Sequence, residues 1–304
     1  MVNIYNFTPL FTTFYHFVNN ILHFFVKQAL NNQKGQQSIK EFFYVLLPSM
    51  NKNFDITNKD GYEYLEIGEG PVLVLLHGLM GGLENFENII DELVLSGYKV
   101  ICPVLPLFTR PLIKTNIKNL NKFLYKFLLY KNIQKASLIG NSLGGHIALV
   151  FAKDHPEMMQ SLILTGSSGL YENSMGDSFP RRGDYNYIKT KTEQVFYDPK
   201  TATKELVDNV FAIANDRNSV IRLLAMAKSA IRHNMSKDIP KLNIPACLIW
   251  GKQDTVTPPH VAEEFHKLFK KSDLYWIDKC GHSPMWEHPK EFVDILIKWL
   301  KINL

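Results

Sequence analysis

Cysteine is scarce in this chain, with three residues among 304. The three, Cys102, Cys247 and Cys280, form an odd set, and two of them fall in predicted strands. Secreted proteins that depend on disulfides carry a paired set, so we expect free thiols, a reducing compartment and a cytoplasmic location. Cys280 lies two residues before His282, where we interpret it as a small apolar filler rather than a catalytic thiol.

Metal-binding and phosphate-binding motifs are also missing. The chain has neither an H-E-x-x-H helix nor a glycine-rich phosphate loop, so we expect no metal and no cofactor. The net charge of +5 is mild. Its short basic clusters, Arg181-Arg182 and Lys270-Lys271, accompany no nucleic-acid-binding motif, and we expect no nucleic-acid partner. A small-molecule substrate is the expected partner, and the sequence leaves the oligomeric state open.

Charged side chains are absent from the first 26 residues, which are rich in phenylalanine, asparagine and tyrosine. Asparagine, threonine and proline interrupt the apolar pattern, and a membrane span needs about 20 mostly apolar residues, so we expect no membrane association. The segment also lacks the basic start and cleavage site of a secretory signal. We interpret residues 1–49 as an N-terminal extension that is disordered, helical or not native, because Met50 resembles a natural start. A membrane-associated lipase is a hypothesis that rests on residues 1–49 alone.

A serine turn is the most informative feature that the chain does have. Gly140-Asn141-Ser142-Leu143-Gly144 follows the apolar run 136–139 and precedes a helix-like run at 147–152. A G-x-S-x-G between a strand and a helix is typical of a nucleophile elbow. Small residues two before and two after the serine avoid a clash, and the first N–H groups of the helix face a developing oxyanion. An ordinary strand–turn–helix with a serine N-cap is the alternative interpretation.

An aspartate and a histidine each follow a later predicted strand. Asp254 comes after the apolar run 246–251, and His282 comes after the run 274–277. The chain order Ser142, Asp254, His282 is the order of α/β-hydrolases and differs from the two other well-known serine-triad orders. Because the carboxyl ends of parallel strands meet at one edge of a sheet, we expect these three residues to meet there.

Four motifs in this order resemble the α/β-hydrolase fold superfamily from about residue 54 to the C-terminus. The strand that ends in His77-Gly78, the serine turn, the acid turn 251–254 and the histidine loop 281–289 carry the resemblance. It implies an α/β fold with a mostly parallel eight-stranded sheet, flanking helices and a helical cap insertion. Among its members, the chain is similar to esterases and to meta-cleavage-product hydrolases.

The expected roles follow from the chemistry of a serine nucleophile. Ser142 needs a base to accept its proton, and His282 is the expected base and later the acid. Asp254 is expected to hold the imidazole in the productive tautomer. The backbone N–H of Leu143 is the first expected oxyanion donor, and by resemblance Leu79 supplies the second.

Other titratable residues are rivals for the roles of acid and base. Asp278 is a rival acid, but it lies too close to His282 in the chain to reach the far side of the ring. His77 is expected to brace the oxyanion loop, and His146 is expected to pack behind the serine turn.

Strand and helix patterns alternate along the chain, which predicts a parallel sheet covered by helices. The core is expected in residues 50–169 and 240–304. Residues 170–239 interrupt the alternation with helix-like segments at 201–214 and 219–233, and we predict that they form a cap that excludes water and shapes the pocket.

Candidate substrate-binding residues lie in the predicted cap and beside the serine. Arg181 and Arg182 could hold a substrate carboxylate, because guanidinium donors form a fork, although solvated loop arginines are an equal alternative. Asn141, next to the serine, is a third candidate. The apolar loop 103–108, where relatives carry an acid and a glycine, is expected to widen or line the site.

These observations predict a serine hydrolase that acts on a small ester or related acyl substrate through an acyl-enzyme on Ser142. Gly140-Asn141-Ser142 also resembles hydrolases that cleave carbon–carbon bonds in meta-cleavage-type dienoates. Those enzymes usually have a tryptophan after the catalytic histidine, whereas this chain has Ser283. Carbon–carbon hydrolysis therefore stays an alternative, as does a non-catalytic ligand receptor on the same fold.

Overall fold

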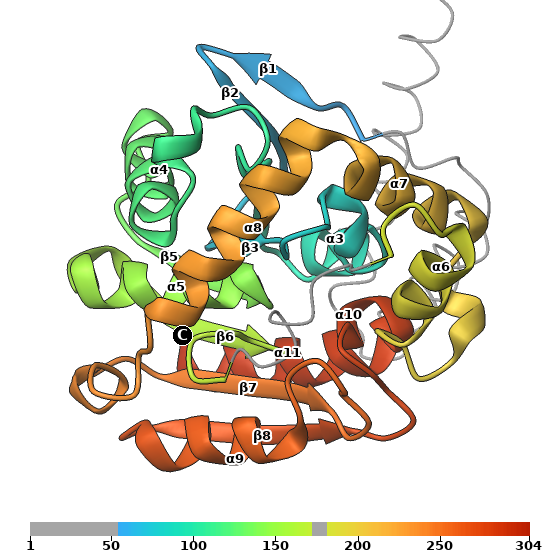
Figure 1. Cartoon of the computed structure of the whole chain (residues 1–304). Helices are drawn as coiled ribbons and strands as arrows, with labels where there is room; N and C mark the ends of the chain where they lie inside the picture. The colour runs from blue at the N-terminus through green and yellow to red at the C-terminus, as the bar shows by residue number, and fades with distance from the viewer. Residues whose placement is uncertain (1–53, 172–180) are drawn as a thin grey trace, which may run out of the picture. The chain divides into compact units, whose positions relative to one another are not determined.

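A single sheet of eight strands lies at the centre of the computed structural model, which describes residues 54–171 and 181–304 (Figure 1). The strands are ordered β1-β2-β4-β3-β5-β6-β7-β8, and β2 pairs antiparallel with both β1 and β4. All other neighbours are parallel, which confirms the predicted fold class. The strands are β1 (Thr57–Lys59), β2 (Tyr62–Ile67), β3 (Val72–Leu76), β4 (Lys99–Pro103), β5 (Ala136–Asn141), β6 (Met159–Thr165), β7 (Ala246–Gly251) and β8 (Ser272–Ile277).

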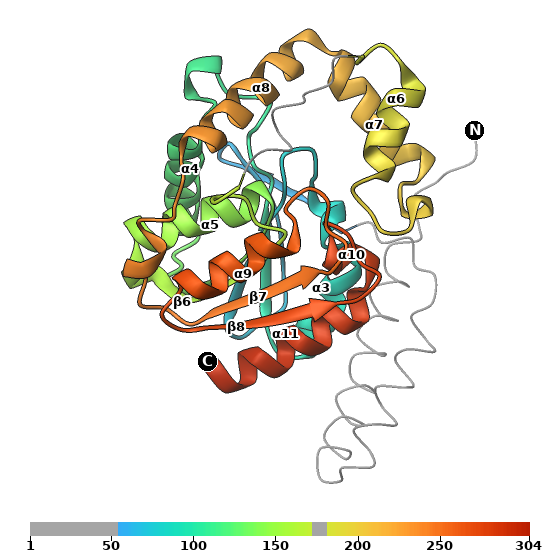
Figure 2. The same cartoon turned by 60° about the horizontal axis from the view of Figure 1, so that its bottom comes forward.

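Helices cover both faces of this sheet (Figure 2). One apolar core joins the sheet to α4, α5 and α9, and a second joins its other face to α3, α10 and α11. The helices of these two layers are α3 (Glu87–Leu95), α4 (Ile117–Tyr130), α5 (Leu143–Asp154), α9 (Pro259–Leu268), α10 (Pro284–Glu287) and α11 (Pro289–Asn303).

The apolar strands explain why the sheet is buried on both faces. In β3, Leu73 and Leu75 pack into one core while Val74 and Leu76 pack into the other. Side chains alternate along a strand, so a continuous apolar run supplies both cores at once. This arrangement places the carboxyl ends of β3, β5, β7 and β8 along one edge of the sheet.

Three further helices lie between β6 and β7: α6 (Tyr185–Glu193), α7 (Lys204–Asn215) and α8 (Arg217–Arg232). Each begins at a side-chain cap, where Asp184, Thr203 and Asp216 accept a hydrogen bond from a backbone N–H of the first turn. The sequence predicted α7 and α8 within a few residues. It did not predict α6, because only Ile188 and Thr192 of that polar helix are buried.

The first hairpin differs in detail from its prediction. The turn was expected at residues 58–61, but β1 continues through Lys59, and Asp60 and Gly61 make the turn with φ of 52° and 79°. Two successive left-handed residues match the twist of a tight hairpin.

Several expectations concern residues that the structure does not describe. The interpretations of residues 1–49 and of the start at Met50 lie outside the described residues, as does part of the expected cap, 172–180. Within the described ranges no helix has the length and apolar character that crossing a membrane requires. The three cysteines are buried free thiols, as the sequence predicted.

Candidate active site

Ser142 occupies a strained backbone position between β5 and α5. Its φ of 54° and ψ of −118° lie outside the regions that residues with a side chain commonly adopt. The end of β6 and the loop after it hold this conformation, because the Ser142 N–H donates to the Thr165 carbonyl at 3.2 Å and its carbonyl accepts from the Ser168 N–H at 3.1 Å. Strain of this kind persists only where the surrounding structure enforces it, and it is typical of functional sites.

Close backbone packing explains the glycines around this serine. A Cβ at Gly144 would lie 1.9 Å from the Leu76 carbonyl oxygen, and a Cβ at Gly140 would lie 2.4 Å from the Gly145 nitrogen. Helix α5 therefore approaches β3 so closely that only glycine fits between them. The steric reason that the sequence suggested for the small residues is present in the structure.

Asp254 and His282 form a hydrogen-bonded pair at the ends of β7 and β8. His282 Nδ1 lies 2.9 Å from Asp254 Oδ2, and both side chains are buried. Asp254 Oδ1 also accepts from the N–H groups of Val256 at 2.8 Å and Thr257 at 2.9 Å, while Oδ2 accepts from the Thr257 hydroxyl at 2.8 Å.

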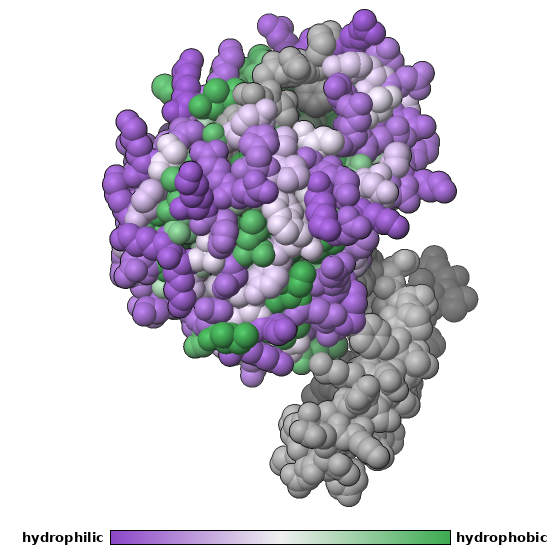
Figure 3. All heavy atoms as spheres, turned by 90° about the horizontal axis from the view of Figure 1, so that it is seen from below, coloured by the Kyte–Doolittle hydropathy of each residue, from purple (hydrophilic) through white to green (hydrophobic). Residues whose placement is uncertain are grey.

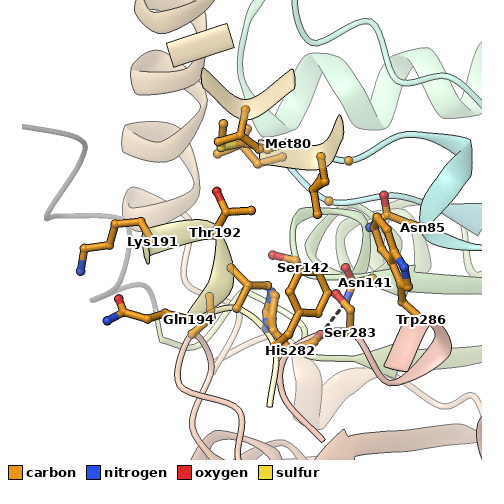
Figure 4. Close-up of a pocket in the computed structure, with 18 of the residues that line it drawn as sticks. Met80, Asn85, Asn141, Ser142, Lys191, Thr192, Gln194, His282, Ser283 and Trp286 are labelled. Carbon is orange, nitrogen blue, oxygen red and sulfur yellow. Dashed lines mark hydrogen bonds between the residues drawn. The ribbon is translucent and has the colours of Figure 1, made fainter. Parts of the chain in front are cut away.

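These contacts orient the imidazole. A carboxylate only accepts hydrogen bonds, so the proton of the neutral ring belongs on Nδ1 and Nε2 is left with its lone pair. His282 and Ser142 line the same pocket (Figure 4), and Nε2 is the ring nitrogen that Asp254 does not hold. Asp278, the rival acid, is exposed and pairs instead with Gln253 and Lys252.

A short segment after α6, residues 194–197, is hydrogen-bonded to both of these loops. The Thr255 hydroxyl donates to the Gln194 carbonyl at 3.0 Å, and the His282 N–H donates to the Val195 carbonyl at 2.9 Å. The Tyr197 N–H donates to Glu287 Oε2 at 2.7 Å. The acid loop and the histidine loop are therefore tied to the region between β6 and β7.

Glu287 connects this segment with the residue before the histidine. Its Oε1 accepts from the Gly281 N–H at 2.8 Å, while its Oε2 holds Tyr197. Burial raises the pKa of Glu287 above its usual value, and hydrogen bonds from backbone N–H groups oppose that shift. Gly281 itself lies so close to this segment that a Cβ would be 2.5 Å from the Val195 carbonyl oxygen.

Of the two expected oxyanion donors, Leu79 lines the pocket, while Leu143 directly follows Ser142 in the chain. Leu79 lies in the loop after β3, and Leu143 is the first residue of α5. Neither backbone N–H is hydrogen-bonded to another residue of 54–171 or 181–304. His77 braces the loop, because its Nδ1 donates to the Gly78 carbonyl at 2.9 Å and its Nε2 accepts from the Leu105 N–H at 3.0 Å. Burial lowers the pKa of His77 to about 4, which keeps the ring neutral.

A pocket of about 400 Å³ opens at Ser142 and His282. Figure 4 shows Lys191 and Gln194 on one side of the serine and Trp286 and Asn85 on the other. Its wall is mostly apolar and comes from the loop after β3, from α6 to α8 and from the histidine loop: Leu79, Met80, Val195, Phe196, Leu206, Val210, Leu223, Ala227 and Trp286. Among the described lining residues there is no arginine, aspartate or glutamate.

The predicted substrate-binding residues divide into two groups. Asn141 lines the pocket, but its amide donates to the carbonyls of Thr165 and His282, each at 3.1 Å, and so joins the serine turn to the histidine loop. Arg181 and Arg182 are exposed and do not line the pocket. Their role in binding stays a prediction.

Two further expectations have a structural outcome. The loop 103–108 was expected to widen or line the site, but none of its residues lines the pocket. Its Leu105 and Leu107 are buried in the core beside α4 instead. His146 is buried behind the serine turn, as predicted, and its Nε2 lies 3.2 Å from His233 Nδ1.

Sequence reasoning missed Thr257, Val195 and Glu287. The spacing of Thr257, three residues after Asp254, is a signal that a local turn around an aspartate would give. Val195 carries no such signal, and neither does the contact of Glu287 with Tyr197, since these contacts join segments about 90 residues apart.

Comparisons with known proteins identify the fold family of the chain. The family model described as "alpha/beta hydrolase fold" matches residues 71–234 and 226–289. A solved alpha/beta hydrolase enzyme from a sediment metagenome of the Mar Chica lagoon, Morocco, is 46% identical, covering 81% of this chain and 98% of that one, with a TM-score of 0.68.

Curated relatives are more distant. A 2-hydroxy-6-oxononadienedioate/2-hydroxy-6-oxononatrienedioate hydrolase of Pseudomonas sp is 27% identical over 77% of this chain and 90% of its own length. An esterase of Exiguobacterium antarcticum, 21% identical with a TM-score of 0.68 over 81% of this chain and 98% of its own, shares the fold.

Proposed function

The chain belongs to the alpha/beta hydrolase fold family, and from this premise we propose that it is a serine hydrolase of a small ester or related acyl compound. The observation that carries the proposal is the position of Ser142. It lies on a strained turn and faces the same apolar pocket as His282, whose ring is held by Asp254.

The proposed reaction has two halves. Ser142 Oγ attacks the acyl carbon while His282 Nε2 takes the hydroxyl proton, and the tetrahedral oxyanion accepts hydrogen bonds from the N–H groups of Leu79 and Leu143. The intermediate expels the leaving alkoxide, which takes the proton from His282. Water, deprotonated by His282, then attacks the acyl-enzyme, and Ser142 recovers its proton as the acid leaves.

The character of the pocket favours an ester with an apolar acyl group. Leu206, Val210 and Leu223 supply apolar surface to the pocket, and a pocket of this size suits a small ligand. Lys191 is the one basic side chain besides His282 among the described lining residues.

Carbon–carbon hydrolysis of dienoates is the second candidate, because several curated relatives are named as hydrolases of such compounds. A dienoate carries a carboxylate, for which a forked guanidinium is the preferred partner. The described lining offers Lys191 instead of an arginine, so the ester proposal takes precedence.

We also propose that residues 170–239 act as the cap and that residues 50–169 and 240–304 form the core. Residues of α6, α7 and α8 line the pocket, and the segment 194–197 is hydrogen-bonded to the acid and histidine loops. A cover of this kind excludes water from the reacting atoms.

The test compares the wild type with Ser142→Ala on p-nitrophenyl esters from acetate to decanoate, and on a meta-cleavage dienoate. The proposal expects ester turnover that is lost in the variant, with a chain-length preference that reports the pocket. Turnover of the dienoate without turnover of any ester would favour the second candidate.

A further inference from the structure

Acidic residues are absent from two long parts of the chain that meet on the surface. No aspartate or glutamate occurs between Glu92 and Asp154, and none occurs within α8. Within them, residues 112–130 and α8 expose seven basic side chains, Lys114, Lys118, Lys122, Lys126, Arg217, Lys228 and Arg232. Lys118, Lys122 and Lys126 are four residues apart along α4, which puts them on one stripe of that helix.

The two parts meet at the 3-10 helix η2 (Leu112–Lys114), and hydrogen bonds to α8 lie on both sides of it along the chain. The Arg222 guanidinium Nε of α8 donates to the Arg110 carbonyl at 2.9 Å, and the Ile117 N–H of α4 donates to the Ser229 hydroxyl of α8 at 3.1 Å. Figures 1 and 2 both show α8 passing beside α4. We call the exposed side chains of η2, α4 and α8 the basic–apolar surface.

Aliphatic side chains protrude from this surface. Ile113 is 86% exposed, Leu112 is 47% exposed, and Ile221 of α8 is 40% exposed. Hydrogen bonds on either side of η2 tie the segment that carries Leu112 and Ile113 to α8. By contrast, the face that points down in Figure 1 is mostly hydrophilic, with separate apolar spots (Figure 3).

The acids at the edge of this surface are engaged elsewhere. Asp216 caps α8 by accepting from the Ser219 N–H, Asp154 accepts from Asn121, and Glu66 pairs with Lys131 and Lys99. The basic stripe therefore keeps its positive potential toward solvent.

We propose that the basic–apolar surface docks on an anionic phospholipid surface. Lysines and arginines beside protruding aliphatic groups match the two contributions to interfacial binding, electrostatic attraction to anionic headgroups and burial of apolar area. A nucleic acid would use the charges but leave Leu112 and Ile113 in water. The opposite side of α8 supplies Leu223 and Ala227 to the pocket, so docking would bring the pocket close to the lipid.

Vesicle sedimentation with the full chain tests this proposal. The wild type should bind vesicles of phosphatidylcholine with phosphatidylglycerol, and bind phosphatidylcholine alone at least tenfold more weakly. Two variants, Leu112→Ser with Ile113→Ser and Lys118→Gln with Lys122→Gln and Lys126→Gln, should each lose about tenfold in affinity for the anionic vesicles. Since these residues lie outside the pocket, turnover of a soluble ester should not change, which separates this test from that of the proposed function.

A matched control comes from the end of α11. Lys298→Gln with Lys301→Gln and Ile302→Ser changes exposed residues of the same types, with Ile302 at 75% exposure, and should leave vesicle binding intact. Equal binding by all variants, equal binding to neutral vesicles, or binding of RNA but of no vesicle would each overturn the proposal.

Discussion

The Asp254 carboxylate accepts four hydrogen bonds from the described part of the chain, and the one donated by His282 Nδ1–H matters for the proposed chemistry. The N–H groups of Val256 and Thr257 and the Thr257 hydroxyl fix the position of this carboxylate independently of the imidazole. The His282 ring is therefore oriented by an Asp254 carboxylate whose rotation is restricted by its own hydrogen bonds.

Asp254→Asn should preserve this geometry but reverse the tautomer, because an amide NH₂ facing Nδ1 puts the ring proton on Nε2. We expect kcat for an ester to fall by about 10⁴-fold, as in other serine triads. Steady-state kinetics of the variant measures the effect. Asp278→Asn, at the exposed rival, is the matched control and should be close to wild type; comparable losses in both variants would contradict the assignment.

Individual residues were predictable where the signal is local. Ser142, Asp254 and His282 each follow a strand in a short motif, so their meeting could be read from the sequence. Glu287 could not, since its carboxylate acts on Tyr197, which a different part of the chain brings to it.

At the scale of elements, the elbow depends on how closely α5 packs against β3. Gly144→Ala would place a methyl group 1.9 Å from the Leu76 carbonyl oxygen, so the helix must shift. We expect the free energy of unfolding to fall by more than about 3 kcal/mol, in the range of severe steric changes. Urea unfolding measures it. Gly183→Ala, where a Cβ meets nothing within 4 Å, should be neutral, and an equally stable Gly144→Ala variant would refute the packing argument.

The tie between the histidine loop and the segment 194–197 allows a second prediction at this scale. Glu287→Gln replaces one acceptor oxygen with a donor, which opposes the N–H of either Tyr197 or Gly281. Losing a buried hydrogen bond to a charged group should reduce the free energy of unfolding by about 2 kcal/mol. The exposed Glu291→Gln on α11 is the control; if both variants unfold alike, the tie contributes nothing.

Elements were predictable in proportion to their apolar pattern. The buried strands are continuous apolar runs and α7 and α8 have a clear helical period, whereas α6 is polar along most of its length. The burial of α6 depends on the packing of Ile188 against α7, a contact that the sequence pattern of α6 does not reveal.

For the whole molecule, stability should decline in mildly acidic solution because of buried neutral histidines. Burial lowers the pKa of His77 from 6.5 to about 4, and burial together with His233 lowers that of His146 to about 3. Below pH 6.5 these two histidines become protonated in the unfolded chain but stay neutral in the folded chain. The free energy of unfolding therefore decreases as the pH falls from about 6.5 toward 4.

His77 alone accounts for about 3 kcal/mol over this window. Glu287, with its raised pKa, makes stability increase as the pH falls and so opposes the effect of the histidines. Carboxylates with lowered pKa values, such as Asp238, reduce stability at pH values below this window. Urea unfolding between pH 8 and pH 4.5 measures the slope, and a flat profile would contradict the buried neutral state.

The most direct measurement of the central claim is covalent labelling with diethyl p-nitrophenyl phosphate, which phosphorylates an activated serine. The account predicts one p-nitrophenol released per chain, a diethylphosphoryl adduct on the peptide that contains Ser142, and no adduct in Ser142→Ala. An adduct on a different residue, or ester turnover by Ser142→Ala equal to that of the wild type, would contradict it.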